Sequence, residues 1–234
     1  MIASSLHPEI EPLCQQLESG VLKKQLSVIP QLASTGDAGW QVLMNFLQAN
    51  KGQDPTPAIG TAYLALYRLD VAEISDFLQT HFSEGIVALK SDRGIDYQLL
   101  QVLLIEQDFQ QSDRLTLEKL CELAGEKAVN RQWLYFSEID RFPVTDLQTI
   151  NTLWLTYSEG NFGFSVQREL WLAQGKNFNK LWEKIGWKKS NNWTRYPNEF
   201  IWNLSAPRGH LPLSNQLRGV QPFASLLAHP AWTE

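Results

Sequence analysis

The chain has 234 residues, of which 44% are hydrophobic and 19% are charged, and its formal net charge is −5. This length suits one large domain or two small ones, and either can bury a core. No apolar run approaches the ~18 residues of a membrane-spanning helix, and the first residues lack the pattern of a secretory signal. Cys14 and Cys121 are isolated, which favours a reducing, cytoplasmic compartment and argues against a disulfide framework or a zinc cluster.

The charge is distributed unevenly along the chain. Residues 1–84 carry 4 Lys or Arg against 9 Asp or Glu, and residues 85–159 carry 7 against 12. Residues 160–234 carry 9 against 4, and this basic part also holds six of the nine tryptophans. We therefore expect the acidic first part and the basic last part of the chain to have different functions.

The first part of the chain reads as short amphipathic helices separated by turn signals. Apolar residues recur at helical spacing in three segments, EIEPLCQQLESG, VLKKQLSVIPQLASTG and DAGWQVLMNFLQAN, the last with Asp37 as a cap. Two more predicted helices, AIGTAYLALYRL and DVAEISDFLQTHF, follow the loop KGQDPTP. This succession of paired helices resembles a helical-repeat bundle of the HEAT type, and a plain helical bundle is an equal alternative. We predict a domain over residues 1–84 and a second domain over residues 85–234, with the boundary in SEGIVALKSDRG.

The second domain is also predicted to be helical as far as Gly186. The predicted helices lie in IDYQLLQVLLIEQDF, QQSDRLTLEKLCELAG, DLQTINTLWLTYSEG, VQRELWLAQG and FNKLWEKIG, with Asp146, Ser165 and Asn177 as caps of the last three. Glycine closes most of them. The predicted fold class is therefore all-α.

Beyond Gly186 the sequence predicts mostly irregular structure. WKKSNNWTRYPNEF reads as a long loop, FIWNL as a short strand or extended piece, and SAPRGHLPLSNQLRGVQPF as irregular. Long loops inside a compact domain are usually functional or disordered, and disorder fits poorly with so many large apolar residues. A binding loop fits better.

Signatures of catalysis are absent from the sequence. There is no phosphate-binding loop and no dinucleotide fingerprint, and the four histidines are scattered without a metal-ligand spacing. His210 lies in a Pro- and Gly-rich segment, where we expect it to hydrogen-bond the backbone. Nucleic acid is an alternative partner for a basic, aromatic surface, but no stripe of Lys or Arg follows a helix, and the acidic first part would repel a polyanion. We expect no nucleic-acid binding.

The aromatic and basic stretch suits a large planar ligand that bears carboxylates. Such a ligand needs a wide apolar floor and cations at the rim. Trp154, Phe162 and Phe164 are candidates for the floor, although a Trp on a helical stripe is also typical of a core. The rim candidates are Arg168, Arg195 and Arg218, and the loop KKSNNWTRYP carries Trp193 at its tip. Trp193 is flanked by polar residues, so we favour a binding role for it.

Several unusual strings occur in order between Gly94 and Trp232: LCELAG, RQWLYFSEIDRFPVTDLQTINTLW, GNFGFSVQRELW, KLWEKIGW, NWTRYP and LSAPRGHLPLSNQLRGV. Together they resemble the genomes-uncoupled tetrapyrrole-binding family of oxygenic phototrophs. The resemblance implies an all-helical core shaped like a cupped hand that binds protoporphyrin IX and magnesium-protoporphyrin IX. It also implies that the protein is not an enzyme and requires no cofactor. Instead, it would stimulate magnesium chelatase in chlorophyll biosynthesis through the large porphyrin-binding subunit of that enzyme.

The same resemblance places binding determinants on the loop with Trp193 and Tyr196 and on NQLR, here Asn215 and Arg218. No metal ligand is expected from the protein itself, because the porphyrin nitrogens would hold a chelated metal. We expect a cytoplasmic monomer, and the basic, aromatic surface leaves peripheral contact with photosynthetic membranes open. Two alternatives remain: a helical scaffold that acts only through protein–protein contacts, and an enzyme that acts on tetrapyrroles.

Overall fold

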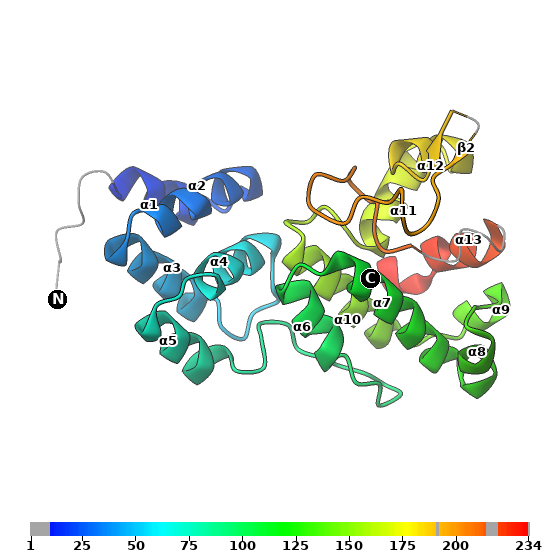
Figure 1. Cartoon of the computed structure of the whole chain (residues 1–234), viewed down its shortest axis with the longest axis horizontal. Helices are drawn as coiled ribbons and strands as arrows, with labels where there is room; N and C mark the ends of the chain where they lie inside the picture. Colours follow the sequence, from blue (N-terminus) through cyan, green and yellow to red (C-terminus); the bar gives the residue numbers. More distant parts are fainter. Residues whose placement is uncertain (1–9, 191, 214–219, 234) are drawn as a thin grey trace. The chain divides into compact units, whose positions relative to one another are not determined.

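The computed structural model describes residues 10–190, 192–213 and 220–233, and almost all of its regular structure is helical (Figure 1). The contacts between Cα atoms divide the chain into two compact units, residues 1–86 and residues 87–234. We call them the N-terminal and the C-terminal unit. Among the described residues, no helix combines the length and the apolar character needed to cross a membrane.

Five helices form the N-terminal unit: α1 Glu11–Glu18, α2 Leu22–Ser34, α3 Asp37–Ala49, α4 Pro57–Tyr67 and α5 Ala72–Phe82. Helix α4 contacts α2, α3 and α5 (Figure 1), and eight of its eleven residues are buried. A helix that is buried on nearly every side is the centre of a bundle. Thr56 begins it by accepting a hydrogen bond from the Ile59 N–H at 3.3 Å, and Pro57 occupies the first turn, where a missing N–H is tolerated.

Helices α2 and α3 approach each other closely at Gly39. A Cβ atom at this position would lie 2.0 Å from the backbone oxygen of Leu32, so only glycine fits there. The predicted cap Asp37 is wrong: Gly36 is the N-cap, and Asp37 is the first residue of α3. An acidic side chain in the first turn still interacts favourably with the helix dipole.

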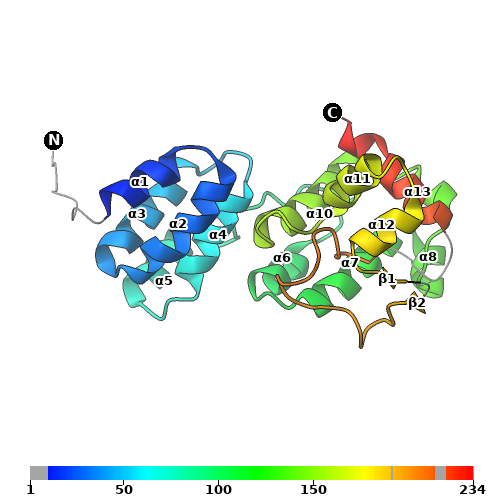
Figure 2. The same ribbon diagram turned by 90° about the horizontal axis from the view of Figure 1, so that it is seen from above.

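The C-terminal unit contains the remaining helices and one small hairpin (Figure 2). The elements are α6 Gln98–Ile105, α7 Phe109–Ala124, α8 Glu126–Arg131, α9 Phe136–Ile139, α10 Val144–Tyr157, α11 Phe164–Ala173, α12 Phe178–Lys184, β1 Lys188–Lys189, β2 Asn192–Trp193, α13 Val220–Ala228 and the 3-10 helix η2 Pro230–Trp232. The two strands pair antiparallel, with Lys188 opposite Trp193 and Lys189 opposite Asn192.

The core of this unit is built around α10, which buries nine of its fourteen residues. Its Trp154 ring stacks on Phe109 of α7, with centroids 6.0 Å apart, and meets Phe162 edge-on at 6.3 Å. The Trp154 indole N–H donates to Thr116 at 3.0 Å, so the buried polar atom is satisfied.

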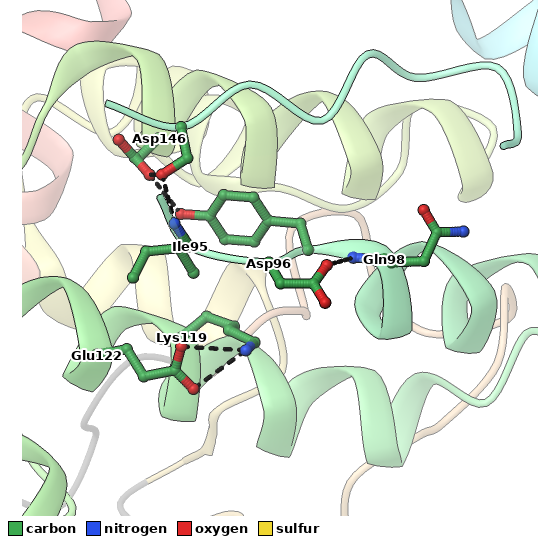
Figure 3. Close-up of polar contacts among 8 residues, drawn as sticks. Ile95, Asp96, Gln98, Lys119, Glu122 and Asp146 are labelled. Carbon is green, nitrogen blue, oxygen red and sulfur yellow. Dashed lines mark hydrogen bonds and ion pairs between the residues drawn. The ribbon is translucent and has the colours of Figure 1, made fainter. Parts of the chain in front are cut away.

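Asp146 of α10 is a buried anchor and not the predicted helix cap, because Pro143 is the N-cap of α10. The Asp146 carboxylate accepts hydrogen bonds from the Ser91 hydroxyl at 2.5 Å, the Asp92 N–H at 2.9 Å and the Tyr97 hydroxyl at 2.8 Å. Figure 3 shows Asp146 beside the segment that contains Ile95 and Asp96. Burial raises the pKa of Tyr97, and the neighbouring Asp146 raises it further. The Tyr97 hydroxyl therefore keeps its proton and remains a donor. The Asp146 carboxylate therefore holds the segment before α6 to α10, and the Thr149 hydroxyl adds a hydrogen bond to the Lys90 carbonyl at 2.8 Å.

Two predicted caps differ in outcome. Asn177 caps α12 as predicted, since its side chain accepts from the Lys180 N–H at 3.1 Å. Ser165 does not cap α11; the N-cap is Gly163, and the Ser165 N–H donates to the Asn151 side chain at 2.9 Å. The start of α11 is thus satisfied from α10, a partner that local sequence does not reveal.

Three α-helices of the C-terminal unit and its 3-10 helix η2 were not predicted. Helices α8 and α9 are shorter than two turns, so they offer few periodic positions. Helix α13, Val220–Ala228, overlaps the end of the predicted irregular segment. Residues 200–204 form no strand.

Replacing Asp146 with alanine should reduce the free energy of unfolding by about 3 kcal/mol, because three donors in and beside the core would lose their acceptor. Lys119→Ala is the matched control: it removes an ion pair to Glu122 at 3.1 Å that lies near the surface (Figure 3), and such pairs are worth up to about 1 kcal/mol. Urea denaturation followed by circular dichroism measures both variants. Equal small losses would show that Asp146 is no anchor.

Candidate functional site

The three rings predicted to form an apolar floor lie inside the C-terminal unit. Trp154, Phe162 and Phe164 have no accessible surface. Trp154 and Phe162 pack against each other and Phe109, while the Phe164 ring lies 6.1 Å from that of Trp232. The expectation that these rings line an open floor does not hold in this structure, because their faces are occupied by neighbouring side chains.

Trp193, in contrast, lies at the surface on the hairpin β1–β2. Its side chain is 41% exposed, and its ring lies 4.7 Å from that of Trp182 and 5.7 Å from the Lys188 ammonium group. The Thr194 hydroxyl donates to the Gly186 carbonyl at 2.8 Å and fixes the end of the hairpin to the end of α12. The hairpin, fixed to the end of α12, therefore holds the partly exposed Trp193 indole beside the Lys188 cation.

Arg195 and Tyr196 follow Trp193 directly and belong to the same loop. Arg195 is exposed, and its backbone N–H donates to the Glu199 carboxylate at 2.8 Å. Tyr196 is 37% exposed, and its ring contacts Phe200 and Trp202 edge-on at 5.5 and 5.7 Å. Three of the predicted site residues, Trp193, Arg195 and Tyr196, are therefore exposed in one short stretch of the chain.

The other predicted rim residues are separate from this loop or are not described. Arg168 lies on α11, half-buried, and its Nε atom has no hydrogen-bond partner among the described residues. Asn215 and Arg218 lie outside the residues that the structure describes.

His210 holds the irregular segment that follows the hairpin. Its Nε2 atom accepts from the Ile201 N–H at 3.2 Å, so Nδ1 carries the proton and donates to the Ile185 carbonyl at 2.7 Å. The His210 carbonyl accepts from the Trp187 indole at 2.7 Å. Burial lowers the pKa of His210, which keeps the ring neutral. The prediction that His210 hydrogen-bonds the backbone is confirmed, and those bonds fix the base of the Trp193 loop.

Gln167 of α11 provides a second support for the same segment. Its Nε2 atom donates to the carbonyls of Gly209 at 3.0 Å and Pro212 at 2.8 Å. Gly209 has a φ of 81°, and a Cβ atom there would lie 2.8 Å from Leu170. Residues 209–212 are therefore seated directly on α11.

Asp113 of α7 is a third support that was not predicted. It is 3% exposed and accepts from the Leu213 N–H at 2.5 Å. Burial raises the pKa of Asp113 to about 7, although the hydrogen bond from Leu213 and the nearby Tyr196 hydroxyl act to lower it. Burial and the neighbouring Asp113 raise the pKa of Tyr196 to about 12. The helical repeat of Phe109, Thr116 and Leu120 already placed position 113 on the buried face of α7, so the sequence did contain a signal for a buried acid.

Among the described residues, no three His, Cys, Asp or Glu side chains gather as they would around a metal ion. His229 is buried and accepts from the Ala231 N–H at 3.1 Å, and burial lowers its pKa. What the arrangement offers is an exposed aromatic and basic loop on a rigid base, which suits binding.

The fold and this loop define a class: an all-α protein with a bundle at its N-terminus and a second helical unit that carries long, anchored loops. A family model described as "GUN4-like" matches residues 90–230, and one described as "ARM-like repeat domain, GUN4-N terminal" matches residues 1–83. The chain belongs to the GUN4-like family, which confirms the resemblance predicted from the sequence. The second match favours helical repeats over a plain bundle in the N-terminal unit.

Known relatives and solved structures agree with this assignment. A "Ycf53-like protein" of Synechocystis sp. is 52% identical over 95% of this chain and 96% of its own length. The "Tetrapyrrole-binding protein, chloroplastic" of Arabidopsis thaliana is 40% identical over 58% of this chain and 55% of its own. The structure of GUN4 from Chlamydomonas reinhardtii superposes with a TM-score of 0.59 at 41% identity, covering 63% of this chain and 95% of that one. The ligand-free structure of Arabidopsis thaliana GUN4 gives 0.55 at 40% identity, over 59% and 99%.

The raised pKa of Asp113 predicts a pH dependence of stability. Between the ordinary carboxyl pKa of about 4 and the folded value of about 7, the folded chain holds a proton that the unfolded chain has released. The contribution of Asp113 to the free energy of unfolding therefore decreases as the pH rises through this range. We expect wild type to lose about 2 kcal/mol relative to Asp113→Asn between pH 5 and pH 8.

Urea denaturation of both proteins at several pH values measures this difference. Ser112→Ala is the control, since Ser112 is the buried neighbour on α7 and its hydroxyl, in the described contacts, bonds only to the carbonyl of Asp108, the N-cap of the same helix. Its offset from wild type should not change with pH. A constant offset for Asp113→Asn as well would contradict the assignment.

Proposed function

We propose that this chain is a non-catalytic regulator that binds protoporphyrin IX and magnesium-protoporphyrin IX and stimulates magnesium chelatase in chlorophyll biosynthesis. The observation that carries the proposal is the exposed aromatic and basic loop Trp193–Tyr196 on a rigid base, in a chain of the GUN4-like family. A relative named as a tetrapyrrole-binding protein supports the choice of ligand.

The chemistry of the loop suits a tetrapyrrole. Trp193, Trp182 and Tyr196 offer ring surface for a flat apolar macrocycle. Lys188 and Arg195 are exposed or half-exposed cations beside them, and Arg can meet a propionate carboxylate with two parallel hydrogen bonds. We assign Asn215 and Arg218 to the same site as further polar contacts, and Arg168 to its rim. The protein requires no cofactor and supplies no metal ligand in this scheme.

The size of the ligand limits the affinity. At roughly −0.3 kcal/mol per non-hydrogen atom, a porphyrin of about 42 such atoms reaches a limit near −12 kcal/mol, which is about nanomolar. Ordering of the loop reduces this gain. We therefore expect dissociation constants in the micromolar to submicromolar range.

The partner that we assign is the large porphyrin-binding subunit of magnesium chelatase. The protein would act as a cytoplasmic monomer, and its basic, aromatic loop is suited to peripheral contact with anionic membrane lipid. The alternative is a scaffold that binds only proteins, which the ARM-like repeats of the N-terminal unit favour.

Porphyrin titration followed by absorption spectroscopy tests the function. We expect a shift of the Soret band that saturates at one porphyrin per chain, and a faster formation of magnesium-protoporphyrin when the loaded protein is added to reconstituted chelatase. A scaffold would leave the Soret band unchanged. Product formed from protoporphyrin and Mg²⁺ without chelatase subunits would instead show an enzyme.

Trp193→Ala should weaken porphyrin binding by about tenfold, because an aromatic anchor contributes roughly 1–2 kcal/mol. Its stability should remain close to that of wild type, since Trp193 is partly exposed. Quenching of tryptophan fluorescence measures the affinity. Tyr67→Ala is the control, because Tyr67 is 42% exposed but belongs to the N-terminal unit, and it should bind as wild type does. Unchanged affinity of Trp193→Ala would remove the loop from the site.

A further inference from the structure

Helix α13 contacts both α9 and α11 (Figure 1), and a cleft of about 390 Å³ lies beside these helices. The residues that line the cleft are Asp140, Trp171, Ala224, Ser225, Ala228, His229 and Pro230. The three from α13 have small side chains, so this face of the helix leaves room for a ligand. The volume lies near the lower end of the range of small-molecule sites, about 300–1,000 Å³. None of these residues belongs to the loop proposed to bind the porphyrin.

Trp171 of α11 brings an unsatisfied donor to the cleft. Its side chain is 8% exposed, and its indole Nε1 atom has no hydrogen-bond partner among the described residues. The Phe178 ring lies 5.3 Å from the Trp171 ring and the Lys176 ammonium group lies 5.6 Å from it, but neither can accept a hydrogen bond from the indole N–H. A buried N–H without an acceptor costs free energy. An acceptor bound in the cleft would remove this cost, and a carboxylate would also be attracted to Lys176.

Asp140, which directly follows α9, brings the opposite charge. Its side chain is exposed and forms no ion pair with a described residue. His229, which also lines the cleft, accepts from the Ala231 N–H at 3.1 Å, and burial lowers its pKa, so its ring is neutral. Asp140 is therefore the charged member of the seven lining residues, and its carboxylate suits an ammonium group.

We propose that this cleft is a binding site for a small zwitterion of the amino-acid class. The carboxylate of the ligand accepts from the Trp171 N–H beside the Lys176 ammonium group, and its ammonium group pairs with Asp140. Its apolar part lies on Ala224 and Ala228. A ligand with only one of the two charges leaves either Asp140 or the indole N–H without a partner, so both charges are needed. This site goes beyond the porphyrin function and does not depend on it.

Titration of the full chain without porphyrin tests the site. The probes are L-leucine and 6-aminohexanoate, which separate the ammonium and carboxylate groups by different lengths. Proton–nitrogen NMR follows binding at the Trp171 indole N–H and at the backbone amides of Ala224, Ser225 and Ala228. We expect at least one probe to shift these signals saturably, with a dissociation constant in the millimolar range because the ligand has few atoms. The absence of a saturable shift with either probe would overturn the proposal.

Matched probes that lack one charge test the class of ligand. N-acetyl-L-leucine and hexanoate keep the carboxylate, whereas L-leucinamide and hexylamine keep the ammonium group. Each should bind at least about tenfold more weakly than the zwitterion that it resembles, because a charge-assisted hydrogen bond is lost. Equal binding of a probe with one charge would show a general site for anions or cations and would contradict the zwitterion class.

Two substitutions test the lining residues. Asp140→Asn keeps the size of the side chain and removes its charge, so it should weaken binding about fivefold. Trp171→Phe keeps a ring and removes the N–H, and the backbone amides should again report a loss of about fivefold or more. The controls lie in the N-terminal unit and should bind as wild type does: Asp76→Asn at an exposed acid of α5, and Trp40→Phe, whose indole N–H already donates to the Ala33 carbonyl at 2.8 Å. Wild-type affinity in Asp140→Asn would overturn the proposal even if Trp171→Phe does not fold.

Discussion

The C-terminal unit depends on one constraint: a long stretch with little regular structure must still satisfy its backbone N–H and C=O groups. Between α12 and α13 the described residues form only the short hairpin. Buried side chains supply hydrogen bonds that a helix or a sheet would otherwise provide to this backbone. His210 joins Ile185 to Ile201, Gln167 holds residues 209–212, and Asp113 holds Leu213. The loop can expose Trp193 because its base is fixed by these three groups, so rigidity and an open aromatic surface coexist.

Helices with a sustained apolar period were predictable from the sequence. The stripes of α3, α7 and α10 span three or more turns, and glycine or asparagine marks their ends. Helices α8 and α9 are too short to show a period. Asp37, Asp146 and Ser165 read as caps in isolation, but capping depends on the geometry at the helix start, and Asp146 has instead a tertiary partner in the segment before α6.

The candidate site was predictable only where local context decided the outcome. Trp193 stands among polar residues, and it is exposed as expected. Trp154, Phe162 and Phe164 lie in or beside helical stripes, where an aromatic side chain that lines a cavity and one that fills a core have the same pattern in sequence. The complete burial of these three side chains assigns them to the core. The helical period of α7 indicates that Asp113 is buried, but no local pattern contains its contact with Leu213, a hundred positions away.

Asp146 also determines where the C-terminal unit can be cut from the rest of the chain. The hydrogen-bond donors to its carboxylate come from Ser91, Asp92 and Tyr97. All three residues precede the first helix of that unit. A fragment that starts at α6 would therefore enclose a carboxylate without its donors. An excised version must retain this leading strip of polypeptide, although the strip contains no helix or strand of its own.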